Sequence, residues 1–198
     1  RETTQSMAHA LFHSGYSPIL RESQDGTAGL TDADGRVIMT GGGLQYHSLL
    51  YTQAVQAVRE CYPPEAMHEG DAFVSNDPYK AGNSHVPDTV VVTPVFYRST
   101  IIAFGVSVAH KADVGGLVPG SSGAAAREIF HDGLLLPPVR VWADGVFNPE
   151  IEAIIRNNSR TPDMVIGDLR GQIGATRLGA ERLIALSDHE RYFRYALL

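Results

Sequence analysis

Two hydrophobic runs near the middle of the chain stand out from its alternation of apolar and polar positions. Residues 90–97 and 101–109 are rich in Val, Ile and Phe, and only the polar residues 98–100 separate them. Runs of β-branched and aromatic residues favour strands, and so short a connection joins antiparallel neighbours. The pattern therefore predicts a β-hairpin.

The register of this hairpin brings metal-binding residue types together at its open end. A three-residue loop that sets Tyr97 opposite Ile101 also sets Asp88 opposite His110. Opposed residues have Cβ atoms about 4.5–5.5 Å apart, so this carboxylate and imidazole can share one ion. His85 lies three residues before Asp88, and the proline between them blocks a helical turn. Two imidazoles and a carboxylate suit zinc, manganese or iron. If the strand register slipped by one residue, one side chain would turn to the other face of the sheet, and His85-x-x-Asp88 would be an ordinary polar loop.

The rest of the chain alternates between helical and extended patterns. Helices are predicted at about 1–14, 48–60, 149–157 and 167–189, a hairpin at 21–39, and extended segments at 72–75 and 127–142. Pro137-Pro138 restricts the last segment to a sheet edge or a loop. We therefore expect an α+β fold with an antiparallel or mixed sheet, flanking helices, glycine-rich loops and a metal site at the end of a β-hairpin.

The length of the chain bounds its organisation. A chain of 198 residues can form one sizeable hydrophobic core. We expect a single domain over residues 1–198, with a trailing helical segment at about 149–198. The chain has no initiator methionine and begins within a helical pattern, so we also expect more sequence before it.

Composition and charge argue against several partners. The formal net charge is −6 and no cluster of Lys and Arg is present, so we expect no nucleic-acid partner. No apolar run approaches the roughly 20 residues of a membrane span, so we expect no membrane partner. The single cysteine, Cys61, cannot form an internal disulfide, which favours a cytoplasmic location.

A run of three glycines, residues 41–43, precedes the second predicted helix. Glycines before a helix can bind a phosphate or a carboxylate, but the spacing and the lysine of a P-loop are missing. A flexible connector is the preferred interpretation. His47, at the end of this segment, could still reach a site.

Several longer motifs occur in order along nearly the whole chain. They are Ser75-Asn-Asp-Pro-Tyr79, Ser84-His-Val-Pro-Asp88, Ala109-His-Lys-Ala-Asp-Val-Gly-Gly116, Glu128-Ile-Phe-His-Asp-Gly133 and Gly167-Asp-Leu-Arg-Gly-Gln-Ile173. With these motifs the chain resembles the hydantoinase B/oxoprolinase family. That family includes metal-bearing subunits of ATP-dependent hydantoinases, 5-oxoprolinases and caprolactamases, and of acetone and acetophenone carboxylases.

The resemblance implies four ligands for one divalent ion, which would be zinc or manganese, or else iron. They are Asp25, His85, Asp88 and His110, of which Asp25 rests on the resemblance alone. We further predict that two acidic residues orient a ligand imidazole or transfer protons. These are Asp113 and Glu128, and the alternative for both is a solvated loop carboxylate.

The chain also departs from the family pattern. Lys111 stands where a second histidine is usual, and His131-Asp132 stands where Gln-Glu is common. These differences leave the implied ligands intact but leave the identity of the substrate open. Family members are also much longer, so the resemblance covers only an N-terminal portion.

The function implied by the resemblance is a metal-bearing subunit of an ATP-coupled cyclic-amide hydrolase. A hydantoinase A-like ATP-binding subunit would phosphorylate a small-molecule substrate, and further copies or chains would complete the family fold. Two alternatives stay open at this point. One is a subunit of an ATP-dependent ketone carboxylase, and the other is a non-catalytic assembly fragment.

Overall fold

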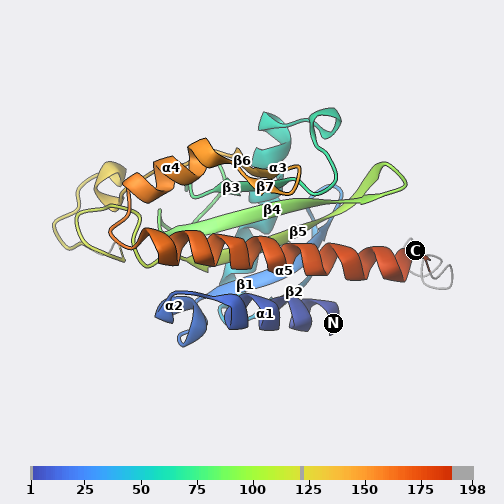
Figure 1. Ribbon diagram of the computed structural model, residues 1–198, viewed down its shortest axis with the longest axis horizontal. Helices are drawn as coiled ribbons and strands as arrows, with labels where there is room; N and C mark the ends of the chain where they lie inside the picture. Colours follow the sequence, from blue (N-terminus) through green and yellow to red (C-terminus); the bar gives the residue numbers. More distant parts are fainter. Residues whose placement is uncertain (1, 121–122, 189–198) are drawn as a thin grey trace.

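A seven-stranded antiparallel sheet forms the centre of the computed structural model, which describes residues 2–120 and 123–188 (Figure 1). Its strand order is β2-β1-β5-β4-β3-β6-β7. The strands are β1 (Gly26–Asp32), β2 (Val37–Gly42), β3 (Ala72–Ser75), β4 (Asp88–Tyr97), β5 (Thr100–His110), β6 (Val139–Ala143) and β7 (Val146–Phe147). Together with the flanking helices, this sheet confirms the predicted α+β class.

Helices cover both faces of the sheet. Helices α1 (Glu2–Ser14) and α5 (Pro162–Asp188) lie side by side and antiparallel on one face, with α2 (Pro18–Arg21) and α4 (Pro149–Asn157) near the end where α5 begins (Figure 1). Helix α3 (Tyr51–Cys61) covers the other face and follows the 3₁₀ helix η1 (Gln45–Leu50). Two shorter 3₁₀ helices are η2 (Pro64–Ala66) and η3 (Ile129–Asp132).

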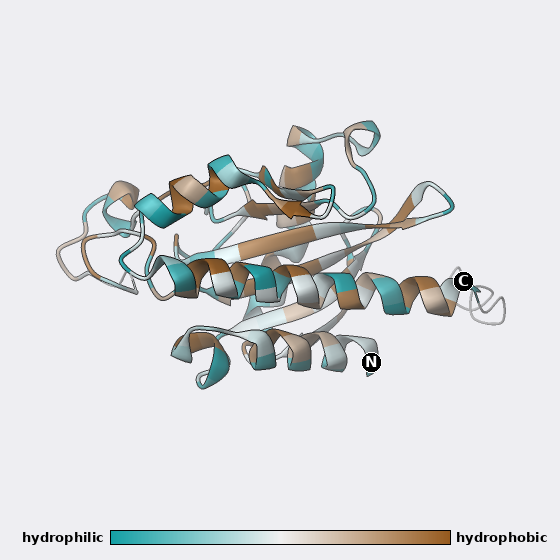
Figure 2. Ribbon diagram, in the orientation of Figure 1, coloured by the Kyte–Doolittle hydropathy of each residue, from teal (hydrophilic) through white to brown (hydrophobic). Residues whose placement is uncertain are grey.

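The alternation of residues along β4 divides the core between these two faces. Val90 and Val92 pack in the cluster that contains α3, whereas Val91 packs in the cluster that contains α4 and α5. All three side chains are essentially inaccessible to solvent, and burial of each one contributes about 1.5–3 kcal/mol. Because both faces are covered, β4 contains an uninterrupted hydrophobic run at residues 90–92 (Figure 2).

The β4–β5 hairpin has the predicted register at its open end, although its turn differs from the predicted one. Tyr97 pairs with Thr100, so the turn contains two residues, 98–99, whose φ angles of 49° and 64° are typical of a tight hairpin turn. A β-bulge in the hairpin then shifts the register by one residue. Asp88 consequently pairs with His110, as predicted.

Helix α5 begins five residues earlier than the sequence indicates. The sequence predicts that Gly167-Asp168 opens it, but the helix begins at Pro162. The Asp168 carboxylate does not cap the helix, because it accepts hydrogen bonds from the backbone N–H groups of Tyr16 and Ser17. The predicted last residue, His189, lies outside the described residues, as does the end of the predicted trailing segment. The single-domain organisation therefore stays a prediction.

The segment interrupted by Pro137-Pro138 is less peripheral than predicted. Strand β6 follows these prolines and pairs with both β3 and β7, so it does not lie at the edge of the sheet. The prolines precede the first residue of β6, where they remove no hydrogen bond from the ladder. The two-residue strand β7 forms the edge instead.

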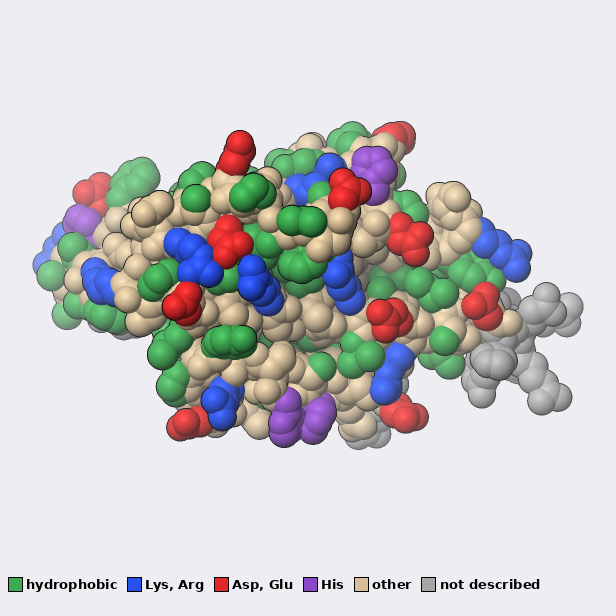
Figure 3. Space-filling view, in the orientation of Figure 1, with side chains coloured by type: hydrophobic (Ala, Val, Ile, Leu, Met, Phe, Trp, Pro, Cys, Tyr) green, Lys and Arg blue, Asp and Glu red, His purple; other side chains and the backbone are tan. Residues whose placement is uncertain are grey.

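On the face of the molecule that carries α1 and α5, acidic and basic side chains are interspersed (Figure 3). Among the described residues, no helix combines the length and the hydropathy that crossing a membrane requires.

Candidate metal centre

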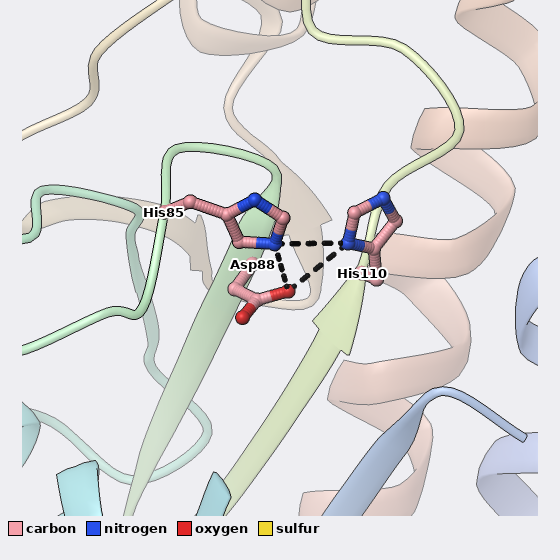
Figure 4. Close-up of side chains that lie close together, drawn as sticks. All are labelled: His85, Asp88 and His110. Carbon is pink, nitrogen blue, oxygen red and sulfur yellow. Dashed lines mark hydrogen bonds and ion pairs between the residues drawn. The ribbon is translucent and has the colours of Figure 1, made fainter. Parts of the chain in front are cut away.

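Three side chains converge at the open end of the β4–β5 hairpin (Figure 4). His85 Nε2 lies 3.0 Å from Asp88 Oδ1, and His110 Nδ1 lies 3.1 Å from the same oxygen. The two imidazole nitrogens are 3.2 Å apart. We refer to His85, Asp88 and His110 as the ligand cluster, and the structure brings together all three residues that the hairpin argument predicted.

The backbone fixes the ligand cluster from two directions. Asp88 is the first residue of β4 and His110 the last of β5, so their pairing places both side chains on one face of the sheet. His85 is held by a tight turn in which Asp88 N–H donates to the His85 carbonyl at 3.1 Å. Asn76 Nδ2 donates to the carbonyl of Val86 at 2.8 Å, and Asn83 Nδ2 donates to that of Asp88 at 2.5 Å. These bonds anchor the loop between the ligands.

Asp25 lies beside His110, directly before the neighbouring strand β1. It precedes β1, and its carbonyl accepts the His110 N–H at 3.1 Å, which extends the β1–β5 ladder by one residue. Its carboxylate is not part of the ligand cluster. Asp25 Oδ1 is buried without a hydrogen-bond partner among the described residues and lies 3.9 Å from His47 Nε2. The structure therefore places Asp25 beside the cluster, and its role as a ligand stays a prediction.

His47 is the histidine that, from its place after the glycine run, could reach a site. It lies in η1, is fully buried, and its Nε2 is 3.5 Å from Asp88 Oδ2. The one signal in the sequence is a histidine four residues after the glycine run 41–43, which is too common a pattern to identify a site.

Burial and the surrounding imidazoles act in opposite directions on Asp88, which is 1% exposed. Burial alone would raise the pKa of this carboxyl, but interactions with His110, His47 and His85 lower it to well below its usual range. The Asp88 hydrogen bond in turn raises the pKa of His85 above 6.5, against the effect of burial. Asp88 is therefore ionised at neutral pH.

The ligand cluster has a spacing that fits a first-row divalent ion. Metal–nitrogen and metal–oxygen bonds of about 2.0–2.1 Å separate neighbouring ligand atoms by roughly 2.9–3.4 Å in octahedral or tetrahedral geometry. The three distances between the ligand atoms of the cluster, 3.0–3.2 Å, lie within this interval. Asp88 Oδ2 also has no hydrogen-bond partner among the described residues. A buried carboxylate in this state favours a cation.

The two predicted catalytic acids lie in other surroundings. Asp113 is 1% exposed, and its Oδ1 accepts a hydrogen bond from Arg160 Nη1 at 2.6 Å and another from Gly115 N–H at 3.1 Å. It joins the loop after β5 to the segment between α4 and α5. Glu128 Oε1 lies 3.6 Å from His131 Nε2, and its side chain is 63% exposed. Neither carboxylate belongs to the ligand cluster, and a catalytic role for either stays a prediction.

Lys111 points away from the ligand cluster, as its place next to His110 in the strand pattern predicts. Its Nζ donates to Gln172 Oε1 of α5 at 2.5 Å. Complete burial lowers the pKa of Lys111 to about 8. The lysine in place of a second histidine therefore lies outside the ligand cluster.

The order of these motifs agrees with one protein family. The family model described as hydantoinase B/oxoprolinase matches residues 1–192. The chain belongs to this family. A Pseudomonas protein described as the putative B component of a D-/L-hydantoinase is 34% identical over 184 residues, which are 91% of this chain and 31% of that protein. The chain thus spans about a third of the length of this hydantoinase B relative.

Two solved structures have the same fold as this hydantoinase B-family chain. The ATP-dependent caprolactamase from Pseudomonas jessenii matches with a TM-score of 0.86 and 28% identity, over 99% of this chain and 34% of that one. A nucleotide-free acetone carboxylase matches with a TM-score of 0.87 and 22% identity, over 98% of this chain and 26% of that one. The second likeness concerns the fold alone.

Proposed function

We propose that this chain is the metal-binding portion of an ATP-coupled cyclic-amide hydrolase of the hydantoinase B/oxoprolinase family. The observation that carries this proposal is the convergence of two imidazole nitrogens and one carboxylate oxygen within 3.2 Å of one another. The hydrolase assignment is supported by 34% identity to the hydantoinase component, compared with 25% to the delta subunit of an acetophenone carboxylase from Aromatoleum aromaticum.

In this proposal each residue of the ligand cluster has a defined task. His85 presents Nε2 and His110 presents Nδ1, so both atoms must be unprotonated when the ion binds. Asp88 supplies negative charge, and Asp25 approaches from the neighbouring strand as a fourth ligand. A zinc, manganese or iron ion would supply Lewis acidity toward an activated carbonyl. The burial of Asp88 and His110 excludes water from the inner side of the site.

The activated carbonyl would come from a partner. We propose that a hydantoinase A-like subunit transfers the γ-phosphoryl group of ATP to the amide oxygen of the substrate, and that this product then reaches the ligand cluster. Such a partner places the reaction in the cytoplasm, where ATP is supplied. Because the chain spans about a third of its hydantoinase relative, further copies or chains would complete the catalytic assembly.

A reconstitution tests the proposal. The chain is loaded with zinc or manganese and combined with a hydantoinase A-like subunit, ATP and a hydantoin or lactam. We expect amide hydrolysis that requires ATP and is lost in His110→Ala, but not in His68→Ala, whose histidine is exposed and does not belong to the ligand cluster. Ketone carboxylation with bicarbonate, in place of hydrolysis, would favour the carboxylase alternative. Full metal content with neither reaction would favour an assembly role.

A further inference from the structure

Three buried polar atoms beside the ligand cluster lack hydrogen-bond partners among the described residues. They are Asp88 Oδ2, Asp25 Oδ1 and Nε2 of His47. His47 Nε2 lies 3.5 Å from the first oxygen and 3.9 Å from the second. Two carboxylate oxygens without donors therefore lie within 3.9 Å of one imidazole nitrogen that has no hydrogen-bond partner among the described residues.

The fold places His47 there through a close backbone contact. A Cβ atom at Gly43 would lie 2.2 Å from the carbonyl oxygen of Gln24, so only glycine allows this approach. The contact holds the segment before η1 against the residue that precedes Asp25. It also explains this part of the glycine run better than the flexible connector suggested by the sequence. The imidazole of His47 is then completely enclosed, with the Tyr46 ring packed edge-on at 4.4 Å.

The two oxygens of Asp88 consequently face different partners. Oδ1 lies within 3.1 Å of both ligand imidazoles, whereas Oδ2 faces His47. An ordinary buried histidine has a hydrogen-bond partner for at least one ring nitrogen, and His47 has none among the described residues. Ligand carboxylates in metal sites are themselves oriented by hydrogen bonds from a second layer of residues. His47 is placed to provide such a bond.

We propose that His47 is a positioning residue of the metal centre. Its Nε2–H donates to Asp88 Oδ2 when the ion binds Oδ1, and the same N–H attracts Asp25 toward the site. His47 thus orients the two carboxylates while remaining outside the set of atoms that bind the ion. This inference rests on the proposed metal site and assigns a function to the histidine that the ligand set leaves unexplained.

The variants His47→Gln and His47→Asn provide a matched pair for the test. Glutamine places its amide nitrogen near the position of Nε2, whereas the shorter asparagine reaches only the position of Nδ1. Zinc affinity is measured by competition with a chromogenic chelator on wild-type protein and both variants. We expect His47→Asn to bind zinc about 10–100-fold more weakly, as second-layer substitutions typically do, and His47→Gln to recover most of this loss.

A nitrogen count on the wild-type protein separates positioning from direct ligation. With Mn²⁺ bound, pulsed electron paramagnetic resonance should detect two coordinated nitrogens, those of His85 and His110. A third imidazole nitrogen would make His47 a ligand and overturn the inference. This measurement requires no variant to fold.

The remaining outcomes are also distinct. Equal zinc affinity in wild type, His47→Gln and His47→Asn would show that His47 only fills space, and the proposed metal site would stand. Equal weakening in both variants, with unchanged circular dichroism, would show that the N–H at Nε2 is not the feature that matters, which also overturns the inference. If the wild-type protein bound no zinc or manganese, the proposed function itself would fail.

Discussion

Two sets of buried polar side chains lie on opposite faces of the same sheet. They differ in how many of their polar atoms have hydrogen-bond partners. On the α3 face, the ligand cluster and its neighbours contain Asp88 Oδ2 and both ring nitrogens of His47 without partners among the described residues. On the α5 face, Lys111 donates to Gln172, and Gln172 donates to the carbonyls of Thr89 and Ser107 at 2.9 and 3.1 Å.

The α5 face also contains Asp168, whose two oxygens accept three hydrogen bonds from Tyr16 and Ser17 at 2.5–3.0 Å. We call Lys111, Gln172 and Asp168 the α5 polar network. A satisfied buried network rigidifies a fold, whereas unsatisfied buried acceptors favour a ligand. The α5 polar network therefore has the properties of residues that stabilise the protein, whereas the ligand cluster has those of the ion site that we propose.

The largest expected effect is on metal content. His85→Ala and His110→Ala each remove one of the two nitrogen ligands, so we expect stoichiometric zinc binding to be lost in both variants. Elemental analysis after dialysis against trace zinc measures this loss. His68→Ala, which changes an exposed histidine, should retain the wild-type zinc content. Unchanged zinc in the two ligand variants would contradict the assignment.

The next largest effect concerns the α5 polar network. Asp168→Ala leaves two backbone N–H groups and a hydroxyl without an acceptor, which should lower the free energy of unfolding by about 3–5 kcal/mol. Urea denaturation measures it. Asp163→Ala, on the exposed first turn of the same helix, should cost less than about 1 kcal/mol. The zinc affinity of the folded protein should be unchanged in both variants. A loss of zinc affinity in Asp168→Ala alone would show that the α5 polar network and the ligand cluster are coupled across the sheet.

Lys111 should make stability depend on pH in a defined direction. Its pKa is about 8 in the folded protein and 10.5 as the reference value, so the unfolded state binds more protons between these limits. The free energy of unfolding should therefore rise as pH increases from 8 to 10.5, by up to about 3 kcal/mol. Lys111→Met should remove this rise, and urea titrations of both proteins at several pH values provide the measurement. If the free energy of unfolding had the same pH dependence in the wild-type protein and in Lys111→Met, the lowered pKa of Lys111 would be contradicted.

Protonation should weaken the ion site on the other face. Because Asp88 raises the pKa of His85 above 6.5, protons compete with the ion as pH falls through this raised value. We expect zinc affinity to decrease by about tenfold per pH unit below it, for one proton displaced. Competition titrations from pH 8 to 5.5 measure the slope. An affinity independent of pH over this range would exclude an imidazole ligand.

The smallest expected effect comes from a substitution that places a histidine on the α5 face, opposite the ligand cluster. Lys111→His introduces the histidine that the family pattern usually has, but its side chain would point toward Gln172 and not toward Asp88. Zinc stoichiometry should stay at the wild-type value. Elemental analysis that finds either loss of zinc or a second equivalent would show that Lys111 and His110 are not separated by the sheet.

The hairpin and the convergence of the ligand cluster at its open end were predictable because they depend on local features. Residue types and a short loop define the strands, and the alternation of side chains then places Asp88 opposite His110. The prediction assumed a three-residue loop, whereas the structure has a two-residue turn followed by a bulge. The two differences offset one another at the open end, so the pairing of the ligands was correct although the turn was wrong.

The parts that could not be predicted depend on contacts between distant segments. The pairing of β1 with β5 places Asp25 beside His110, and no residue near Asp25 indicates which strand it joins. Asp168 was placed only at the start of the last predicted helix, whereas the backbone groups that it binds are 151–152 residues away in sequence. His47 was ambiguous for the same reason, since its importance arises from Asp25 and Asp88.

The most direct test of this account is an anomalous scattering experiment on crystals of the zinc-loaded protein. We predict one zinc peak for each chain, within about 2.0–2.2 Å of His85 Nε2, His110 Nδ1 and one oxygen of Asp88. A zinc peak bound by other residues, or its absence here in protein that carries one equivalent of zinc, would contradict the claim that these three side chains form the metal centre.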